Sequence, residues 1–313
     1  MYFPISGVET PLWLPPLAAF IVSFFTSMGG VSGAFLLLPF QMSFLGYASP
    51  SVSATNQLFN VVATPSGVYR YFREGRLVWP LAAVVAAGTL PGVFLGAVAR
   101  VAWFPNADSF RLFAGIVLLY IGIKMARDLL RGSPRPTRAG APNRPSESSG
   151  GFKPQAGAED GASKVRVTRC SWSRIGYEFH GERYDFSTPG IFALCFVVGV
   201  VGGTYGIGGG SIIAPFFVTV FGLPVYTVAG AALLGTFITS VAGVVFFQVL
   251  APLHPSMAVA PDWMLGLLFG LGGMAGMYLG ARLQKRVPAR IIKGMLTAIV
   301  LAAAMRYVFK ALA

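Results

Sequence analysis

Apolar residues are grouped along the chain in blocks that polar or glycine-rich stretches separate. In the first half, the blocks cover residues 12–28, 33–45, 50–69, 77–99 and 109–130. In the second half, they cover 188–203, 208–222, 225–249, 262–282 and 288–312. A helix needs about 20 apolar residues to cross a bilayer, so the pattern predicts an all-α membrane protein with about five hydrophobic segments in each half. The first two of each half are predicted to be short or broken helices, which could be half-helices, a re-entrant hairpin or two tilted spans.

Clusters of glycine interrupt the beginning of both halves. Residues 202–211 read GGTYGIGGGS, and residues 29–33 read GGVSG. Each glycine costs a helix about 1 kcal/mol relative to alanine, and irregular backbone survives at membrane depth only when it is buried in protein or lines a wet cavity. We therefore expect both helices to break here. Paired interruptions in corresponding segments of two halves indicate the binding site of a transporter.

The two halves are copies of one unit. At one constant offset, Pro39, Gly46 and Gly67 recur as Pro215, Gly222 and Gly243. Further along, Gly88, Gly92 and Gly96 match Gly272, Gly276 and Gly280, and Arg111 and Gly115 match Arg290 and Gly294. The pattern predicts a first transmembrane repeat in 1–130, a linker in 131–187 and a second repeat in 188–313. Small residues at every fourth position let helix backbones approach closely, so we expect the two glycine ladders to pack one repeat against the other.

An odd number of crossings in each copy implies that the repeats have inverted topology. The loop at 70–76 carries three arginines, whereas its counterpart at 250–261 has no Lys or Arg. Conversely, three basic residues lie in 282–286, whereas the counterpart at 100–108 has one Arg and one Asp. Cytoplasmic loops are enriched in Lys and Arg. The pattern therefore predicts a multi-pass protein with a cytoplasmic linker and both termini extracytoplasmic.

The linker changes character along its length. Residues 131–162 are rich in Pro, Gly, Ser and Arg, and we expect them to be disordered. From Lys164, apolar and polar residues alternate on both sides of His180 and Gly181, which predicts a small β-hairpin. The hairpin is interpreted as a folded cap on the cytoplasmic connection, with a regulatory or partner-binding flap as the alternative.

Composition agrees with the membrane assignment and excludes other classes. Apolar residues make up 55% of the chain and charged residues 11%, with a mean hydropathy of +0.67. The net charge of +13 is explained by basic loops and anionic lipid headgroups rather than by nucleic acid. Cys170 and Cys195 lack the spacing of a metal or redox site. No Asp, Glu or His lies near the middle of a segment, so we expect no enzyme activity, catalytic residue, metal or cofactor.

Neutral polar residues near the two glycine clusters are the candidate site. A broken helix offers free backbone N–H groups and the positive end of its dipole, which favours a small anionic substrate. The expected substrate-binding residues are Ser32, Gly33, Asn56, Gln57, Asn60, Thr204, Tyr205, Gly206, Gly208, Gly209, Gly210, Ser211 and Thr236. Two alternatives stay open: the polar side chains could serve only as hydrogen bonds between helices, and unwound carbonyls could hold Na⁺ instead of an anion.

These motifs together resemble the sulfite exporter TauE/SafE family. The resemblance covers about 17–130 and 188–312 and rests on the glycine cluster followed by Pro215, its weaker copy before Pro39, and the glycine ladders. It implies a permease of the bacterial inner membrane that moves sulfite, sulfoacetate or a similar organosulfonate, in the direction of export, by alternating access. An anion channel of the same fold and a non-transporting scaffold acting through the linker hairpin remain rival functions. The oligomeric state is left open, with a homodimer as one option.

Overall fold

The computed structural model describes residues 1–28, 32–73, 75, 77–131, 165–179, 181–283 and 289–312, and these are mostly helical. The first half contains α1 (Leu14–Met28), α2 (Ala34–Phe44), α3 (Ser51–Ala63), α4 (Pro65–Arg73), α5 (Trp79–Ala102) and α6 (Ala107–Arg131). The second half contains α7 (Thr188–Tyr205), α8 (Gly210–Thr219), α9 (Val225–Leu250), the short turn Ala251–Leu253, α10 (Trp263–Leu283) and α11 (Ala289–Leu312).

Five of the described helices are long and apolar enough to cross a membrane. Their apolar stretches are Trp79–Ala102, Ala107–Arg127, Thr188–Tyr205, Thr227–Leu253 and Trp263–Gly280. By contrast, α2 has 11 residues and α8 has 10. At a rise of about 1.5 Å per residue each is only about 15 Å long, half of the roughly 30 Å hydrocarbon layer. The second segment of each half is therefore a half-length helix, as the pattern predicts. For the first segments the prediction is wrong at α7, which is one of the five long helices, whereas α1 is shorter.

The third block of the first half, predicted as one segment over 50–69, is two helices. It divides into α3 and α4 at Thr64, immediately before Pro65. Proline has no backbone N–H to continue the ladder and restricts the residue before it, which explains the division. The corresponding block of the second half has no internal proline and forms the single long helix α9.

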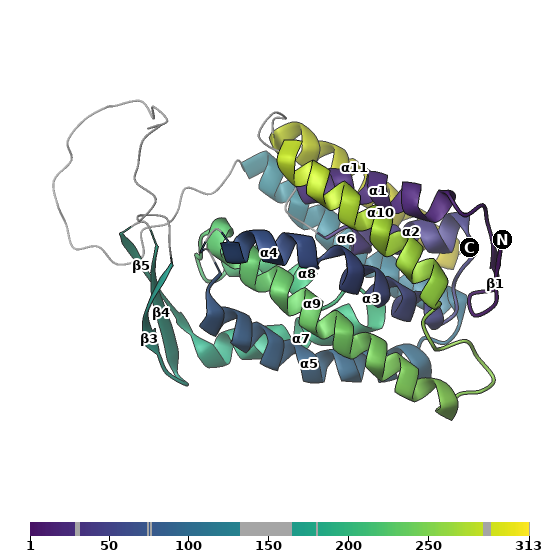
Figure 1. Cartoon of the computed structure of the whole chain (residues 1–313), viewed down its shortest axis with the longest axis horizontal. Helices are drawn as coiled ribbons and strands as arrows, with labels where there is room; N and C mark the ends of the chain where they lie inside the picture. The colour runs from purple at the N-terminus through teal and green to yellow at the C-terminus, as the bar shows by residue number, and fades with distance from the viewer. Residues whose placement is uncertain are drawn as a thin grey trace.

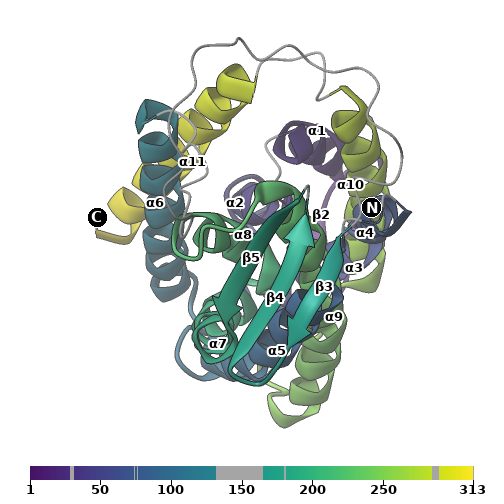
Figure 2. The same ribbon diagram turned by 90° about the vertical axis from the view of Figure 1, so that its left-hand side faces the viewer.

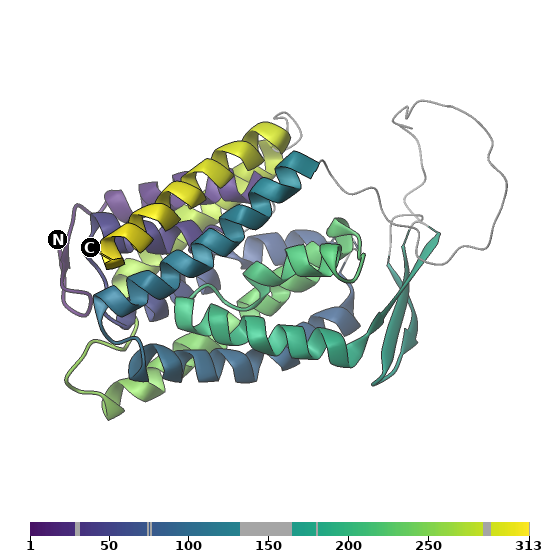
Figure 3. The same ribbon diagram turned by 180° about the vertical axis from the view of Figure 1, so that it is seen from behind.

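Helices of the two halves pack against each other. Figures 1 and 3 show α5 beside α7 and α9, α10 beside α1 and α3, and α6 beside α11. The contacts of α5 with α7 and α9 thus have counterparts in those of α10, the matching helix of the second half, with α1 and α3. The glycine ladders lie in these contacts: a methyl group on Gly92 would be 2.3 Å from Phe196 O, and one on Gly276 would be 2.2 Å from Phe20 O. The prediction that the ladders pack one half against the other is confirmed.

The chain termini lie together at one end of the helical body and a small sheet lies at the other (Figures 1 and 3). A short hairpin of β1 (Tyr2–Phe3) and β2 (Val8–Glu9) belongs to the terminal end. The placement of both termini opposite the linker agrees with the predicted topology, whereas which end faces the cytoplasm stays a prediction.

The sheet has three antiparallel strands: β3 (Arg166–Cys170), β4 (Arg174–Phe179) and β5 (Glu182–Ser187). The predicted hairpin is β4 and β5, which pair through Tyr177 and Tyr184, and β3 is an additional strand on the free edge of β4. Figure 2 shows the sheet lying across the ends of α7 and its neighbours. Its buried face packs on these helices, and the Tyr177 hydroxyl lies 2.8 Å from Thr227 Oγ1 at the start of α9. Burial raises the pKa of Tyr177, so its hydroxyl stays neutral. The predicted disorder of 131–162 falls almost wholly outside the described residues.

Candidate functional site

The second glycine cluster breaks the chain between α7 and α8. Helix α7 ends at Tyr205 and is capped by Gly206, whose φ of +87° is left-handed, and Gly208 follows with a φ of +69°. Glycine adopts this conformation at little cost, whereas other L-residues are strained in it. The backbone therefore turns at two residues that have no side chain, and α8 begins at Gly210. The cluster forms a helix break as predicted.

Two asparagines of α3 bind the carbonyl groups of this break. Asn56 Nδ2 donates to Gly206 O at 3.0 Å, and Asn60 Nδ2 donates to Ile207 O at 3.0 Å. The same side chains reach the first break: Asn56 Nδ2 also donates to Ala34 O at 2.9 Å, and Ser32 Oγ donates to Asn60 Oδ1 at 2.9 Å. The two glycine clusters, which are far apart in the sequence, therefore meet at one helix.

Several predicted site residues use their polar groups within the protein. Thr204 Oγ1 donates to Gly96 O at 3.1 Å, and Tyr205 OH donates to Phe35 O at 2.9 Å. Thr236 Oγ1 donates to Ala232 O at 2.9 Å. The bonds of Thr204 and Tyr205, like those of Asn56 and Asn60, match the alternative in which polar side chains join helices, whereas the bond of Thr236 lies within α9. The side chain of Ser211 lies outside the described residues.

Other buried polar groups beside the break are unsatisfied. Gln57 is fully buried, and neither its Oε1 nor its Nε2 has a hydrogen-bond partner among the described residues. It lies against α9, where a methyl group on Gly243 would be 2.9 Å from its Nε2. One turn earlier on α9, Ser240 Oγ is equally buried and unpartnered, and it borders Gly208. An unmade buried hydrogen bond costs about 1–3 kcal/mol, so a polar occupant would stabilise this region.

The helices that begin at the two breaks have glycine at the N-cap position, and at α2 the N–H of Ala34 donates to Ser32 Oγ at 3.3 Å. The N-cap residues of α2 and α8 are Gly33 and Gly209, and neither N-cap residue makes a side-chain cap hydrogen bond. Ser23 Oγ, buried and unpartnered among the described residues, borders Gly33. Free N–H groups and a helix dipole carry partial positive charge, which attracts an anion. Both predicted half-sites therefore combine a helix that has no N-cap side chain with an unsatisfied hydroxyl group, although at α2 the N–H of Ala34 is already bound by Ser32.

Arg100, near the end of α5, was missed as a site residue because the sequence places it at the end of a segment. Its side chain is fully buried, and no carboxylate of the described residues is within ion-pair distance of it. Its Nε donates to Ser53 Oγ at 3.3 Å, its Nη2 donates to Ala48 O at 2.9 Å, and its Nη1 donates to Phe104 O.

Arg100 is connected to the break through Ser53. Ser53 Oγ donates to Thr204 O at 3.0 Å, and the backbone of Ser53 contacts Gly206 directly. The guanidinium also lies 3.7 Å from the centroid of the Phe110 ring. A buried cation without a carboxylate partner makes the surroundings of the break electropositive. Among the described residues, no group of three His, Cys, Asp or Glu side chains is placed to hold a metal ion.

Comparison with known proteins assigns the chain to a family. Residues 16–307 match the family described as Sulfite exporter TauE/SafE. The chain belongs to the sulfite exporter TauE/SafE family. No solved structure shows significant similarity to this TauE/SafE chain.

Three relatives of this TauE/SafE protein are named as membrane transporters. The probable membrane transporter protein YunE of Bacillus subtilis is 22% identical over 85% of this chain and 86% of its own length. The probable membrane transporter protein ORF9 of Sinorhizobium sp is 25% identical over 93% of this chain and 89% of its own length. A probable membrane transporter protein of Xylella fastidiosa is 24% identical over 86% of this chain and 83% of its own length.

Proposed function

We propose that this TauE/SafE protein is a secondary transporter that exports a small sulfur oxyanion or organosulfonate across the bacterial inner membrane. The observation that carries the proposal is a pair of unsatisfied polar side chains: Ser240 beside the α7–α8 break, and Gln57 against Gly243 one turn further along α9. Together with the two helix starts that have glycine at the N-cap, these groups supply neutral donors for an anion. Sulfite and sulfonates present several acceptor oxygens on one centre, which suits such a set of N–H and O–H groups.

Alternating access follows from a symmetrical arrangement of the two halves. The pairing of α5 with α7 and α9 matches that of α10 with α1 and α3, as expected for inverted repeats. The chain runs from α2 to Tyr47, which is connected by hydrogen bonds through Thr55 and Asp262 to Ser6 at the terminal end. From α8 the chain runs to Thr227, which lies beside Tyr177 of the sheet. The two half-helices thus diverge from the breaks, and rocking of one repeat against the other would expose the site to each side in turn.

Export needs no coupling ion in this proposal. With the linker in the cytoplasm, as the basic loops indicate, an interior-negative membrane potential drives an anion outward by about 2.3 kcal/mol per charge per 100 mV. The test is flux of labelled sulfite and sulfoacetate into and out of proteoliposomes at imposed potentials. Saturable uptake that is stimulated by unlabelled substrate on the far side would support alternating access. Linear, non-saturable flux would favour the anion channel instead.

Replacing Gln57 by Leu is expected to lower transport without lowering the stability of the protein. Removal of an unsatisfied amide should leave the free energy of unfolding unchanged or raise it by about 1 kcal/mol. If Gln57 binds substrate, the same change should lower kcat/KM for anion transport by at least tenfold. Thermal unfolding in detergent and proteoliposome flux measure the two effects. Gln248→Leu makes the same change at an exposed position of α9 and should alter neither. Unchanged transport by Gln57→Leu would remove Gln57 from the site.

Deletion of residues 138–160 tests the scaffold alternative. The deletion avoids every described strand and helix, so a transporter should keep its sulfite flux within about twofold of the intact chain. A non-transporting scaffold that acts through the hairpin would show no sulfite flux in either form, because the deletion leaves β4 and β5 in place. Flux that disappears specifically on deletion would contradict the assignment of the site to the helical body.

A further inference from the structure

A cavity of about 430 Å³ lies away from the α7–α8 break, between α1, α2 and α11. Most of its lining is apolar, and several lining side chains are open to the surroundings of the helical body: Ile299 is 47% exposed and Phe44 is 75% exposed. In a protein that spans a membrane, such side chains face lipid. The cavity is therefore a groove, referred to below as the α2–α11 groove, that opens toward the bilayer.

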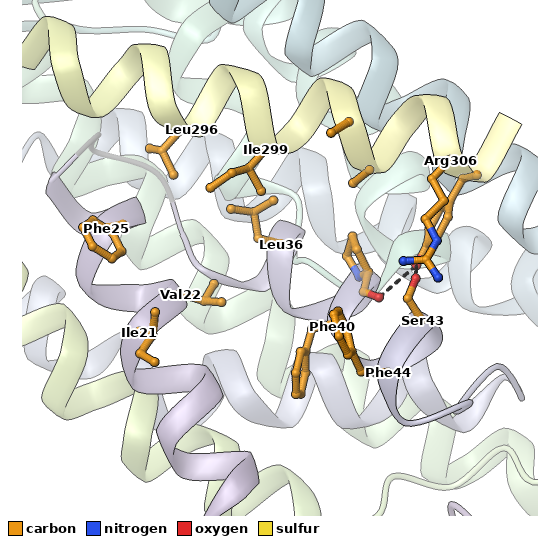
Figure 4. Close-up of a pocket in the computed structure, with 14 residues that line it drawn as sticks. Ile21, Val22, Phe25, Leu36, Phe40, Ser43, Phe44, Leu296, Ile299 and Arg306 are labelled. Atoms are coloured by element: carbon orange, nitrogen blue, oxygen red, sulfur yellow. Dashed lines mark hydrogen bonds between the residues drawn. The ribbon is translucent and has the colours of Figure 1, made fainter. Parts of the chain in front are cut away.

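The α2–α11 groove is polar at one end only. Figure 4 shows Arg306 and Ser43 together at one end, and Leu36, Leu296 and Phe25 toward the other. Ser43 Oγ donates to Tyr307 OH at 3.3 Å, and Tyr307 OH donates to Pro39 O at 3.1 Å. Arg306 is exposed and has no carboxylate partner among the described residues. The groove thus combines an unpaired cation with a long apolar wall.

The matching position in the other half is filled by side chains. The constant offsets between the halves align Phe40 with Phe216, Ile299 with Tyr120 and Ala303 with Lys124. In that half, Tyr120 stacks on Phe216 with 6.0 Å between ring centroids, and Lys124 Nζ lies 3.6 Å from the centroid of the same ring. At the matching positions of α11, the smaller Ile299 and Ala303 place neither an aromatic ring nor a cation against Phe40, which packs instead on Phe44 and Phe269. The side chains that face the aligned phenylalanine therefore differ between the two halves, and those of α11 leave room in the α2–α11 groove.

We propose that the α2–α11 groove holds an acyl chain of an anionic phospholipid, with the lipid phosphate at Arg306. Arg306 lies within two turns of the end of α11, on the terminal side of the protein where headgroups of that leaflet are found. A phosphate is a good partner for a guanidinium because it accepts two parallel hydrogen bonds. An acyl chain suits the apolar wall, which offers a small hydrophilic solute no hydrogen bonds. Because α2 forms one wall, the bound lipid supports the half-helix that leads away from the first break.

The test compares lipid binding by the intact protein with that of two variants. Delipidated protein is placed in nanodiscs of pure phosphatidylcholine or of phosphatidylcholine with phosphatidylglycerol, and retained lipid is measured by native mass spectrometry after gentle extraction. The double variant I299Y/A303K reproduces the residues that close the groove in the other half and should abolish retention of phosphatidylglycerol. Arg306→Gln should lower the preference for phosphatidylglycerol over phosphatidylcholine by about tenfold. Arg282→Gln, at another exposed arginine, should leave that preference unchanged.

Several results would overturn the proposal. Equal retention of phosphatidylglycerol by the intact protein and I299Y/A303K would show that the groove holds no lipid. A preference unchanged by Arg306→Gln would remove the phosphate from Arg306. Conversion of a dimer to a monomer by I299Y/A303K would mean that a second copy of the chain covers the groove, and competition of sulfite with lipid would mean that the transported solute enters there. The measurement does not depend on transport, so it can fail or succeed independently of the proposed function.

Discussion

Replacing Gly206 by Ala is expected to destabilise the protein by about 3 kcal/mol or more and to abolish transport. A left-handed φ costs an L-residue about 1–2 kcal/mol, and Gly206 has a φ of +87°. In addition, a methyl group there would lie 2.4 Å from the carbonyl oxygen of Ser53, a backbone atom that cannot rotate away. Such overpacking typically costs a further 1–3 kcal/mol. Relief of the clash would separate α7 from α3 and pull the carbonyl of Gly206 away from Asn56.

Gly222 provides the matched control for this change. Its φ of +64° is also left-handed, but a methyl group there would have no neighbour within 4 Å. Gly222→Ala should therefore show only the conformational cost of about 1–2 kcal/mol. Thermal unfolding of the two purified variants and their flux in proteoliposomes measure the difference. Equal unfolding temperatures would mean that the contact with Ser53 is not tight, and that the break tolerates a side chain.

The helical fold could be predicted because its signals are local. Block length and glycine clusters are properties of the sequence alone, and they located the short helices α2 and α8 and the break at Gly206. The ladder at Gly88, Gly92 and Gly96 predicted close packing because only small residues permit it. The third strand β3 was not predicted as a separate strand: alternation begins at Val165 and Val167, but the strand is exposed throughout, so no buried apolar face distinguishes it from the edge of a two-stranded hairpin.

The candidate site was predictable by region but not by the role of each residue. Polar residues in an apolar segment pointed to α3. Asn56, Gln57 and Asn60 all carry a neutral amide, however, so the sequence does not show which of them is free to bind a substrate. Only tertiary contacts show that Asn56 and Asn60 bind carbonyl groups of the break whereas Gln57 is unsatisfied. Likewise, only the contact of Ser240 with Gly208 shows that its hydroxyl group lies beside the break. Side-chain hydrogen bonding between helices depends on their relative rotation, which the sequence pattern does not specify.

Replacing Arg100 by Met is the second change with a large expected effect, and its effect should fall on transport more than on stability. The variant loses three hydrogen bonds, two of them to the carbonyl groups of Ala48 and Phe104. It also removes the cost of burying a cation, which is several kcal/mol. These contributions oppose each other, so the free energy of unfolding should change by no more than about 2 kcal/mol.

Transport should respond differently, because nothing replaces the positive charge. At an effective dielectric constant of about 20, an anion about 10 Å from the guanidinium gains about 1.7 kcal/mol, which corresponds to more than tenfold in binding. We therefore expect Arg100→Met to raise KM for sulfite at least tenfold, and Arg100→Lys, which keeps the charge, to raise it much less. Arg111→Gln removes an arginine at the same end that is paired with Asp108 at 2.7 Å and should leave KM unchanged. A folded Arg100→Met protein with normal KM would make Arg100 a structural residue that joins two loops. A KM raised equally by Met and Lys would show that the hydrogen-bond geometry matters rather than the charge.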